Sequence, residues 1–149
     1  MIPTVESLPD VYEADEIAWL ETMAELIAEG KNEELDFAHL QEFLTDMAKR
    51  ERREVHHRLV VLIAHLLKWT HQKKKRTGSW RATIFLQSEE LAGILDSRTL
   101  RNHAEEVLAQ AYKSGVRAAA LETGLAAGAF PKKCPWTLAT LLAEDDLED

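Results

Sequence analysis

Histidine and carboxylate side chains supply the first candidate chemistry in this chain of 149 residues. Glu54 and His57 are three residues apart, and in a helix this spacing places both side chains on one face. A ferritin-like dimetal centre needs two such pairs and two further glutamates, whereas the sequence contains one clear pair. The pair is therefore a candidate for binding a metal ion, and a solvated charged helix surface is the competing interpretation.

His65 is a second candidate, because it is the one polar residue within the apolar stretch of residues 59–67. In a packed helix an imidazole is generally a neutral, hydrogen-bonded core residue, since burial disfavours its charged form. It could serve as a general base or a pH switch if a carboxylate lay within reach. The acids that we consider for that role are Glu42, Asp46 and Glu122, which complete the candidate catalytic set.

Positive charge concentrated in residues 49–81 is the third candidate. The segment has eleven Lys and Arg residues against two acids, a formal charge of +9, while the rest of the chain carries −17. Its cations could bind carboxylates or phosphates, and two tryptophans could act as stacking surfaces; the cations considered are Lys68, Lys73, Lys74, Lys75, Arg76 and Arg81, beside Trp69 and Trp80. Because tryptophans at helical spacing also suit a core, an acidic protein partner is preferred to nucleic acid.

Cys134 is the single cysteine of the chain, which excludes an internal disulfide and a multi-cysteine zinc site. The neighbouring Lys133 could lower the pKa of its thiol, but packing beside Trp136 is the simpler interpretation. The sequence has no phosphate-binding glycine loop, no nucleophile elbow and no zinc-protease motif. We therefore expect no cofactor.

The elements that would position these residues are all predicted to be helices. Apolar spacings of three and four continue through the charged patch at residues 49–54, which favours one long helix over two. The almost wholly apolar stretch within it predicts a helix surrounded by its neighbours. We expect helices from Asp10 to Gly30, from an Asp36 cap to Trp69, from a Ser79 cap to Leu95, from a Ser97 cap to about Gly124, and from a Thr137 cap to Ala143.

The predicted fold is all-α, a bundle of about four main helices with an extended C-terminal arm and a short terminal helix. The length suits one domain, so we expect a flexible N-terminal arm at residues 1–9, a single helical domain at residues 10–143 and an acidic tail at residues 144–149. No apolar run approaches the roughly 20 residues that span a bilayer, and the first residues lack the features of a targeting segment. A cytoplasmic protein without membrane contact is expected.

Several short motifs occur in one order along nearly the whole chain, from about Tyr12 to the C-terminus. They are Leu35 to Met47, His65 to Trp69, Ser79 to Ile84, Glu122 to Gly124, and a Phe-Pro-X-X-Cys-Pro motif at residues 130–135. In these motifs the chain resembles a bacterial family known only as domain of unknown function twenty-nine. The resemblance implies an all-helical fold, and it assigns no activity and no functional residue.

The preferred interpretation is an uncharacterised helical protein that acts as a protein-interaction or adaptor module. Its basic surface would dock an acidic protein or a second copy of the chain, because the charge is strongly dipolar. Two alternatives stay open. One is a small hydrolase or metal-dependent enzyme with a carboxylate and histidine cluster, and the other is a nucleic-acid-binding module.

Overall fold

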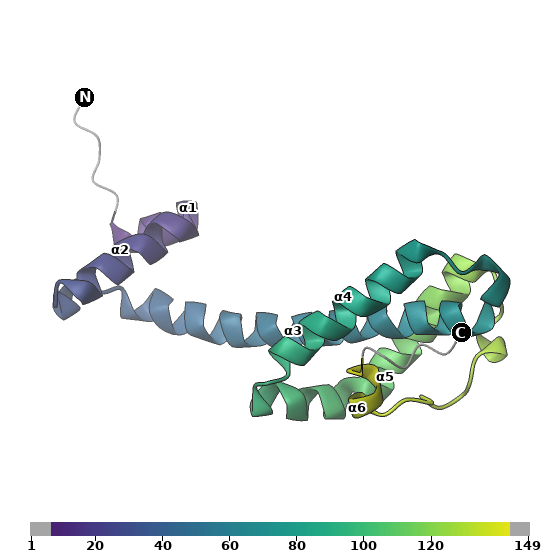
Figure 1. Ribbon diagram of the computed structural model, residues 1–149. Coiled ribbons are helices and arrows are strands. Elements are labelled where there is room, and N and C mark those ends of the chain that lie inside the picture. The colour runs from purple at the N-terminus through teal and green to yellow at the C-terminus, as the bar shows by residue number, and fades with distance from the viewer. Residues whose placement is uncertain (1–6, 144–149) are drawn as a thin grey trace. The chain divides into compact units, whose positions relative to one another are not determined.

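The computed structural model describes residues 7–143, and every regular element within them is helical, as Figure 1 shows. The helices are α1 Leu8–Ala14, α2 Glu16–Ala28, α3 Phe37–His71, α4 Gly78–Ile94, α5 Arg98–Thr123 and α6 Leu138–Leu141, with short 3-10 turns at η1 Asn32–Glu34, η2 Lys73–Lys75 and η3 Ala127–Ala129. The prediction of an all-α fold is confirmed for these residues. None of the described helices is both long enough and apolar enough to cross a membrane.

The chain divides into two compact units, Met1–Lys49 and Arg50–Asp149, which we call the first and the second unit. The first unit contains α1, α2, η1 and the start of α3, and the second contains the remaining elements. The single helical domain expected at residues 10–143 stays a prediction. The expected acidic tail and residues 1–6 of the expected N-terminal arm lie outside the described residues.

The single first helix expected from Asp10 to Gly30 is wrong, because the chain breaks at Asp15 and forms two helices, α1 and α2. Asp15 is extended, with φ of −154°, and its carboxylate accepts a hydrogen bond from the Ala18 backbone N–H at 3.1 Å. The acid therefore caps α2 instead of continuing one helix. Helix α1 also begins two residues earlier than expected, at Leu8.

The prediction of one long helix through the charged patch is confirmed, since α3 runs without a break over 35 residues. It begins after Asp36, whose side chain accepts a hydrogen bond from the His39 backbone N–H at 3.3 Å. This is the N-cap geometry that the sequence predicts, because an aspartate oxygen satisfies an N–H that has no partner within the helix. The next helix differs, because α4 is capped by Thr77 and not by Ser79.

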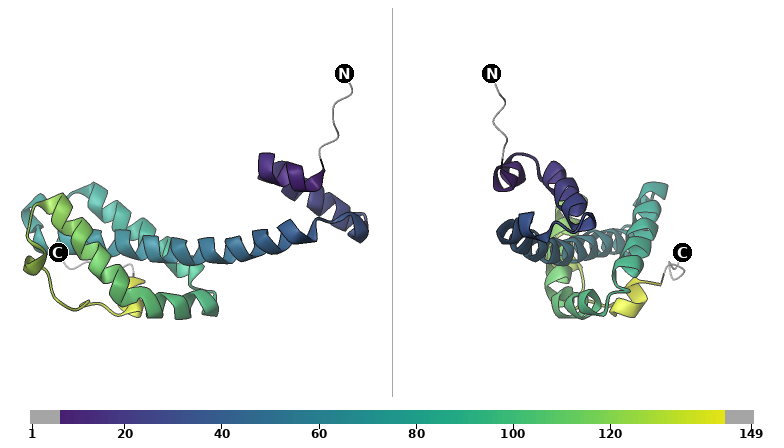
Figure 2. Two further views of the ribbon diagram at one scale, coloured as in Figure 1. Left: turned by 180° about the vertical axis from the view of Figure 1, so that it is seen from behind. Right: turned by 90° about the vertical axis from the view of Figure 1, so that its left-hand side faces the viewer.

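The core of the second unit forms around the C-terminal half of α3, where Leu59, Leu62, Ile63 and Leu67 are fully buried. Figure 2 shows α4 and α5 flanking this part of α3. The helices α3 and α5 approach closely at Gly115, where a Cβ atom would lie 2.6 Å from Cγ2 of Ile63. The predicted burial of the apolar stretch of residues 59–67 is therefore confirmed at these positions.

The segment after α5 returns along the second unit and closes its core. Gly124 ends α5 with φ of 76°, a left-handed conformation that glycine adopts without a Cβ penalty. Phe130 is buried, and the Tyr112 hydroxyl donates a hydrogen bond to the Pro131 carbonyl. Ser88 on α4 donates to the Leu141 carbonyl at 3.0 Å, so α6 is attached to the body of the unit.

Candidate functional site

An exposed part of the predicted cationic surface is η2, which we call the basic turn and define as Lys73, Lys74 and Lys75. All three residues are exposed, and they form a 3-10 turn between α3 and α4. Arg81, in the first turns of α4, is exposed as well. Four of the six predicted docking cations therefore face solvent.

Arg76 anchors the basic turn to the second unit. Its Nε donates a hydrogen bond to the Trp69 carbonyl oxygen at 2.9 Å, and its guanidinium carbon lies 4.4 Å from the centre of a Trp69 ring. This cation–π contact and the hydrogen bond hold Arg76 half-buried. Trp69 itself is buried, so its ring is not available as an open stacking surface for a nucleic-acid base.

Lys68 differs from the surface position that the sequence suggests, because its side chain is only 8% exposed. Its ammonium lies 2.5 Å from Oε2 of Glu122 on α5 and 5.0 Å from the centre of a Trp80 ring. A buried cation is costly unless it is paired, and the carboxylate of Glu122 supplies the pair. Lys68 is therefore an internal residue of the second unit and not part of an accessible docking surface.

His65 lies on α3 one turn before Lys68 and hydrogen-bonds to the Val61 carbonyl at 2.8 Å through Nδ1. A carbonyl oxygen only accepts, so Nδ1 carries the proton and Nε2 keeps its lone pair. Burial lowers the pKa of His65, the bond to Val61 opposes that shift, and Lys68 lowers the pKa further. The structure thus places His65, Lys68 and Glu122 near one another, with the imidazole biased towards its neutral form.

The remaining candidate acids do not join this cluster within one unit. Glu42 and Asp46 belong to the first unit, where both raise the pKa of Tyr12 after its larger rise from burial. His65 and Glu122 belong to the second unit. The candidate catalytic set is therefore divided between two units.

Glu54 and His57, the candidate metal pair, also have separate surroundings. The Glu54 carboxylate accepts a hydrogen bond from Nε of Arg58 at 2.7 Å, while His57 is exposed. Among residues 7–143, no three His, Cys, Asp or Glu side chains are arranged so that they could hold a metal ion. Cys134 donates to the Trp136 carbonyl, and burial raises the pKa of its thiol, which opposes nucleophilic activation.

A cluster that the sequence analysis missed lies in the first unit around Asp36. Its Oδ2 accepts hydrogen bonds from Nδ1 of His39 at 2.7 Å and from the indole N–H of Trp19 at 3.2 Å. Tyr12 stacks on the His39 ring with centroids 4.2 Å apart, and Nε2 of His39 lies 3.5 Å from a Glu13 oxygen. The Asp-x-x-His spacing at a helix start is visible in the sequence, but the contacts with Tyr12 and Trp19 depend on the fold.

The Asp36 cluster shifts both of its titrating groups. The hydrogen bond to Asp36 raises the pKa of His39 above its ordinary 6.5, and the charges of Asp36 and Glu13 add to this rise. Burial acts to raise the pKa of Asp36, but the hydrogen bonds from His39 and Trp19 outweigh it and hold that pKa below 3.8. Asp36 is thus a stable anion that favours protonated His39.

Comparison with known families identifies the chain. Residues 11–147 match the family described as "Domain of unknown function DUF29". The chain belongs to this family. The DUF29 match begins in α1 and includes both units, so it confirms the resemblance that the sequence motifs indicate. No curated protein and no solved structure matches the chain significantly.

Proposed function

We propose that this DUF29 chain is a protein-interaction module that docks an acidic protein through its basic turn. The observation that carries the proposal is the exposure of three consecutive lysines on a turn whose next residue, Arg76, is fixed to Trp69. Because the turn is already anchored at Arg76, its backbone loses little freedom when the lysines bind, which favours association. They also steer an oppositely charged partner during encounter.

An acidic protein suits this turn better than a nucleic acid does. The whole chain carries a formal charge of −8, and the first unit contributes 13 acids against 2 bases, or −11. The net negative charge of the chain opposes binding of a long polyanion, whereas a protein can present a local group of carboxylates to the turn. Trp69 is buried and Trp80 is half-buried beneath Lys68, so neither tryptophan presents a fully open face for base stacking.

The test uses the full chain and two polyanion probes, fluorescein-labelled polyglutamate and a single-stranded oligonucleotide. The variant Lys73→Glu, Lys74→Glu, Lys75→Glu should weaken polyglutamate binding about tenfold or more at low salt, measured by fluorescence anisotropy. The matched control is Lys113→Glu, Lys132→Glu, Lys133→Glu, which makes the same change in charge at three other exposed lysines of the second unit. The control should change binding by less than about threefold.

Equal loss in both triple variants would contradict a local docking surface, because it would show a response to net charge alone. Tighter binding of the oligonucleotide, with a steep salt dependence, would favour the nucleic-acid alternative. Sedimentation velocity of the unmodified chain at low salt tests whether the acidic partner is a second copy. If the unmodified chain forms a dimer and the basic-turn variant does not, the acidic partner is a second copy of the chain.

A further inference from the structure

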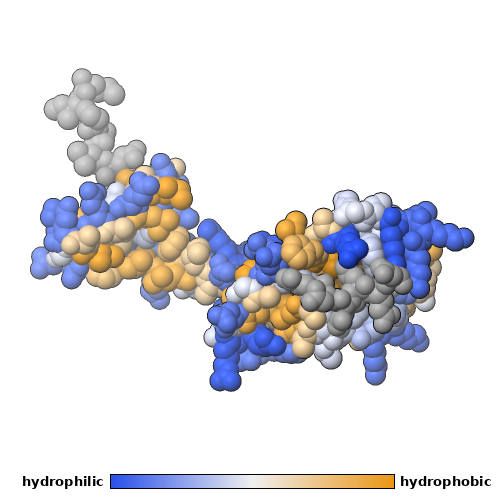
Figure 3. All heavy atoms as spheres, in the orientation of Figure 1, coloured by the Kyte–Doolittle hydropathy of each residue, from blue (hydrophilic) through white to orange (hydrophobic). Residues whose placement is uncertain are grey.

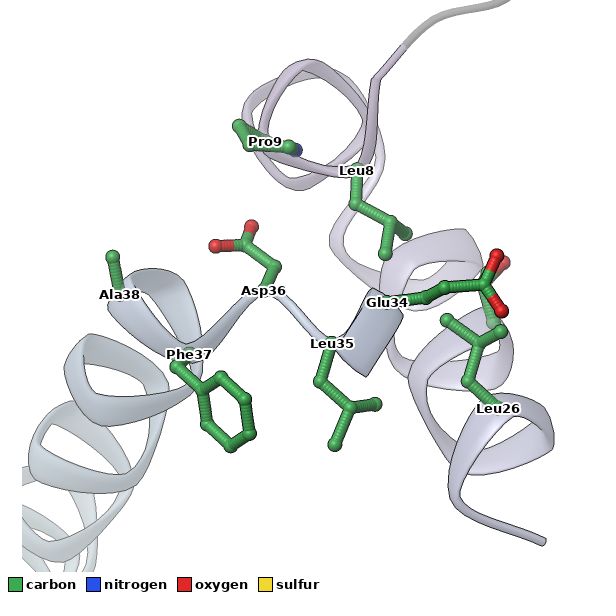
Figure 4. A pocket seen from close by; sticks show the side chains of 9 residues that line it. Leu8, Pro9, Leu26, Glu34, Leu35, Asp36, Phe37 and Ala38 are labelled. Atoms are coloured by element: carbon green, nitrogen blue, oxygen red, sulfur yellow. The ribbon is translucent and has the colours of Figure 1, made fainter. Parts of the chain in front are cut away.

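An apolar hollow in the first unit forms a second surface, separate from the basic turn. It has a volume of about 820 Å³ and opens widely to solvent. Figure 4 shows its lining side chains, which come from α1, α2, η1 and the start of α3. Most of them are apolar, and the residues concerned are Leu8, Pro9, Thr22, Leu26, Glu34, Leu35, Asp36, Phe37 and Ala38.

One large apolar side chain at this hollow, Phe37, is exposed, and Leu8, Leu26 and Leu35 are partly exposed. Phe37 leaves 61% of its surface exposed, and its ring lies beside Leu35 in Figure 4. Figure 3 shows apolar surface gathered over the helices of the first unit. In that unit Ile17, Ile27 and Leu44 are also more than half exposed. Such an apolar area on a small unit marks an interaction site.

Two acidic residues, Glu34 and Asp36, line the hollow together with its apolar side chains. Glu34 lines the hollow, and within the described residues its carboxylate has no hydrogen-bond or ion-pair partner. Asp36 also lines it, although its carboxylate is already engaged by Trp19 and His39. With a formal charge of −11 on the first unit, a partner that covers the hollow must be basic as well as apolar.

We infer that the hollow binds a basic amphipathic helix of another protein. Its apolar side chains would cover Leu26, Leu35 and Phe37, and its lysines or arginines would face Glu34 and the neighbouring acids. An extended peptide would need a sheet edge or an aromatic-lined groove, and the described residues contain no strand and only one aromatic lining residue. Sites for small molecules are generally more enclosed than this open hollow, which argues against a small-molecule ligand. The first unit's negative charge disfavours an anionic membrane surface.

This inference goes beyond the proposed function and rests on different residues. If both hold, the basic turn of the second unit and the hollow of the first unit bind partners of opposite charge. One chain could then connect an acidic protein to a basic one. The hollow can bind its partner even if the basic turn binds nothing, so either proposal can be wrong while the other is correct.

The test measures binding of a fluorescent 18-residue helical peptide made of leucine and lysine to the full chain. A scrambled peptide of the same composition has the same charge but no apolar stripe, and it should bind at least about tenfold more weakly. Phe37→Ala and Glu34→Lys should each weaken binding of the amphipathic peptide about fivefold to tenfold. The matched controls are Phe85→Ala and Glu89→Lys, at exposed residues of α4 in the second unit, which should change it less than twofold.

Two results would overturn the inference. Equal binding of the scrambled and amphipathic peptides would show attraction by charge without use of the apolar hollow. Sedimentation that finds a dimer, dissociated by Phe37→Ala, together with no peptide binding, would assign the hollow to a second copy. Hydrogen exchange of α2 in each variant confirms that the first unit is folded, so loss of binding is not loss of structure.

Discussion

Among the described residues of the first unit, two large apolar side chains are buried, Trp19 and Met23. The second unit buries apolar side chains from α3, α4, α5, α6 and the segment after α5 in one cluster. Polar contacts add to the small apolar core of the first unit, because Asp36 accepts hydrogen bonds from both Trp19 and His39. Small units bury a smaller fraction of their surface and are less stable. The comparison indicates a stable second unit and a first unit that depends on a few side chains while keeping an apolar surface open.

The largest effect is expected for Trp19→Ala. Trp19 is fully buried and donates its indole N–H to Asp36, so the substitution removes the larger of the two buried apolar side chains and leaves a carboxylate oxygen with one partner fewer. The cost should be about 3–5 kcal/mol, enough to unfold the first unit. Hydrogen exchange followed by mass spectrometry should show loss of protection in α2 while α5 remains protected. Equal loss in α5 would show that the two units fold as one.

Gly115→Ala tests the dense packing of the second unit. The added Cβ would lie 2.6 Å from Cγ2 and 3.0 Å from Cβ of Ile63, a β-branched residue that is fully buried. Overpacking costs about 1–3 kcal/mol, and the gain in helix propensity of up to about 1 kcal/mol offsets part of it. We expect a net loss of about 1–2 kcal/mol in urea denaturation. Gly93→Ala, on α4 with no atom near its added Cβ, is the control and should be neutral or stabilising.

Much of the fold could be predicted from residues that act locally. The caps Asp36, Ser97 and Thr137 and the end of α5 at Gly124 were predicted correctly, because each depends on its own neighbours in the chain. The break at Asp15 was missed because an acidic residue suits both the first turn of a helix and its N-cap.

The candidate site was harder to predict because its contacts join distant parts of the chain. Lys68 was included among the docking cations because it extends the positive charge of the basic segment, and lysine side chains usually reach solvent. Its partner Glu122 lies 54 residues further along the sequence, so neither the burial nor the ion pair is visible in a local pattern. The Asp36 cluster was missed for the same reason, as Trp19 and Tyr12 approach it from other helices.

A double-mutant cycle on Lys68 and Glu122 would sharpen the comparison between the two units, because it measures a buried ion pair within the more apolar second unit. Glu122→Gln should cost about 1–2 kcal/mol, between the values for exposed and fully buried pairs, since Glu122 is 51% exposed. Lys68→Met combined with Glu122→Gln should recover most of that loss, because no charge remains buried. Additive costs, measured by urea denaturation, would contradict a direct interaction.

The smallest expected effect is a response to pH that has opposite signs in the two units. His39 faces Asp36, Glu13, Glu42 and Tyr12, and its pKa is raised. Protonated His39 therefore contributes its full stabilisation of the first unit below pH 6.5, and this stabilisation is lost as the pH rises through the raised pKa. The lowered pKa of His65 means that stability falls as pH drops from 6.5 towards that lower pKa.

Hydrogen exchange at pH 5.5 and pH 8, corrected for the intrinsic rate, should therefore show α2 relatively more protected at the lower pH and α5 relatively more protected at the higher pH. His39→Gln should remove the response in α2, and His65→Gln should reduce that in α5. A response of the same sign in both units would contradict the assignment of the two histidines.

Because Lys68 is buried, the reactivity of its amine can report on transient opening of the second unit. Amine-acylating reagents should modify the three lysines of the basic turn rapidly, because their side chains are exposed, while Lys68 lies against Trp80 and Glu122. Acylation of Lys68 then requires a transient opening of its contacts with Trp80 on α4 and Glu122 on α5, and its rate relative to Lys74 would measure how often that opening occurs.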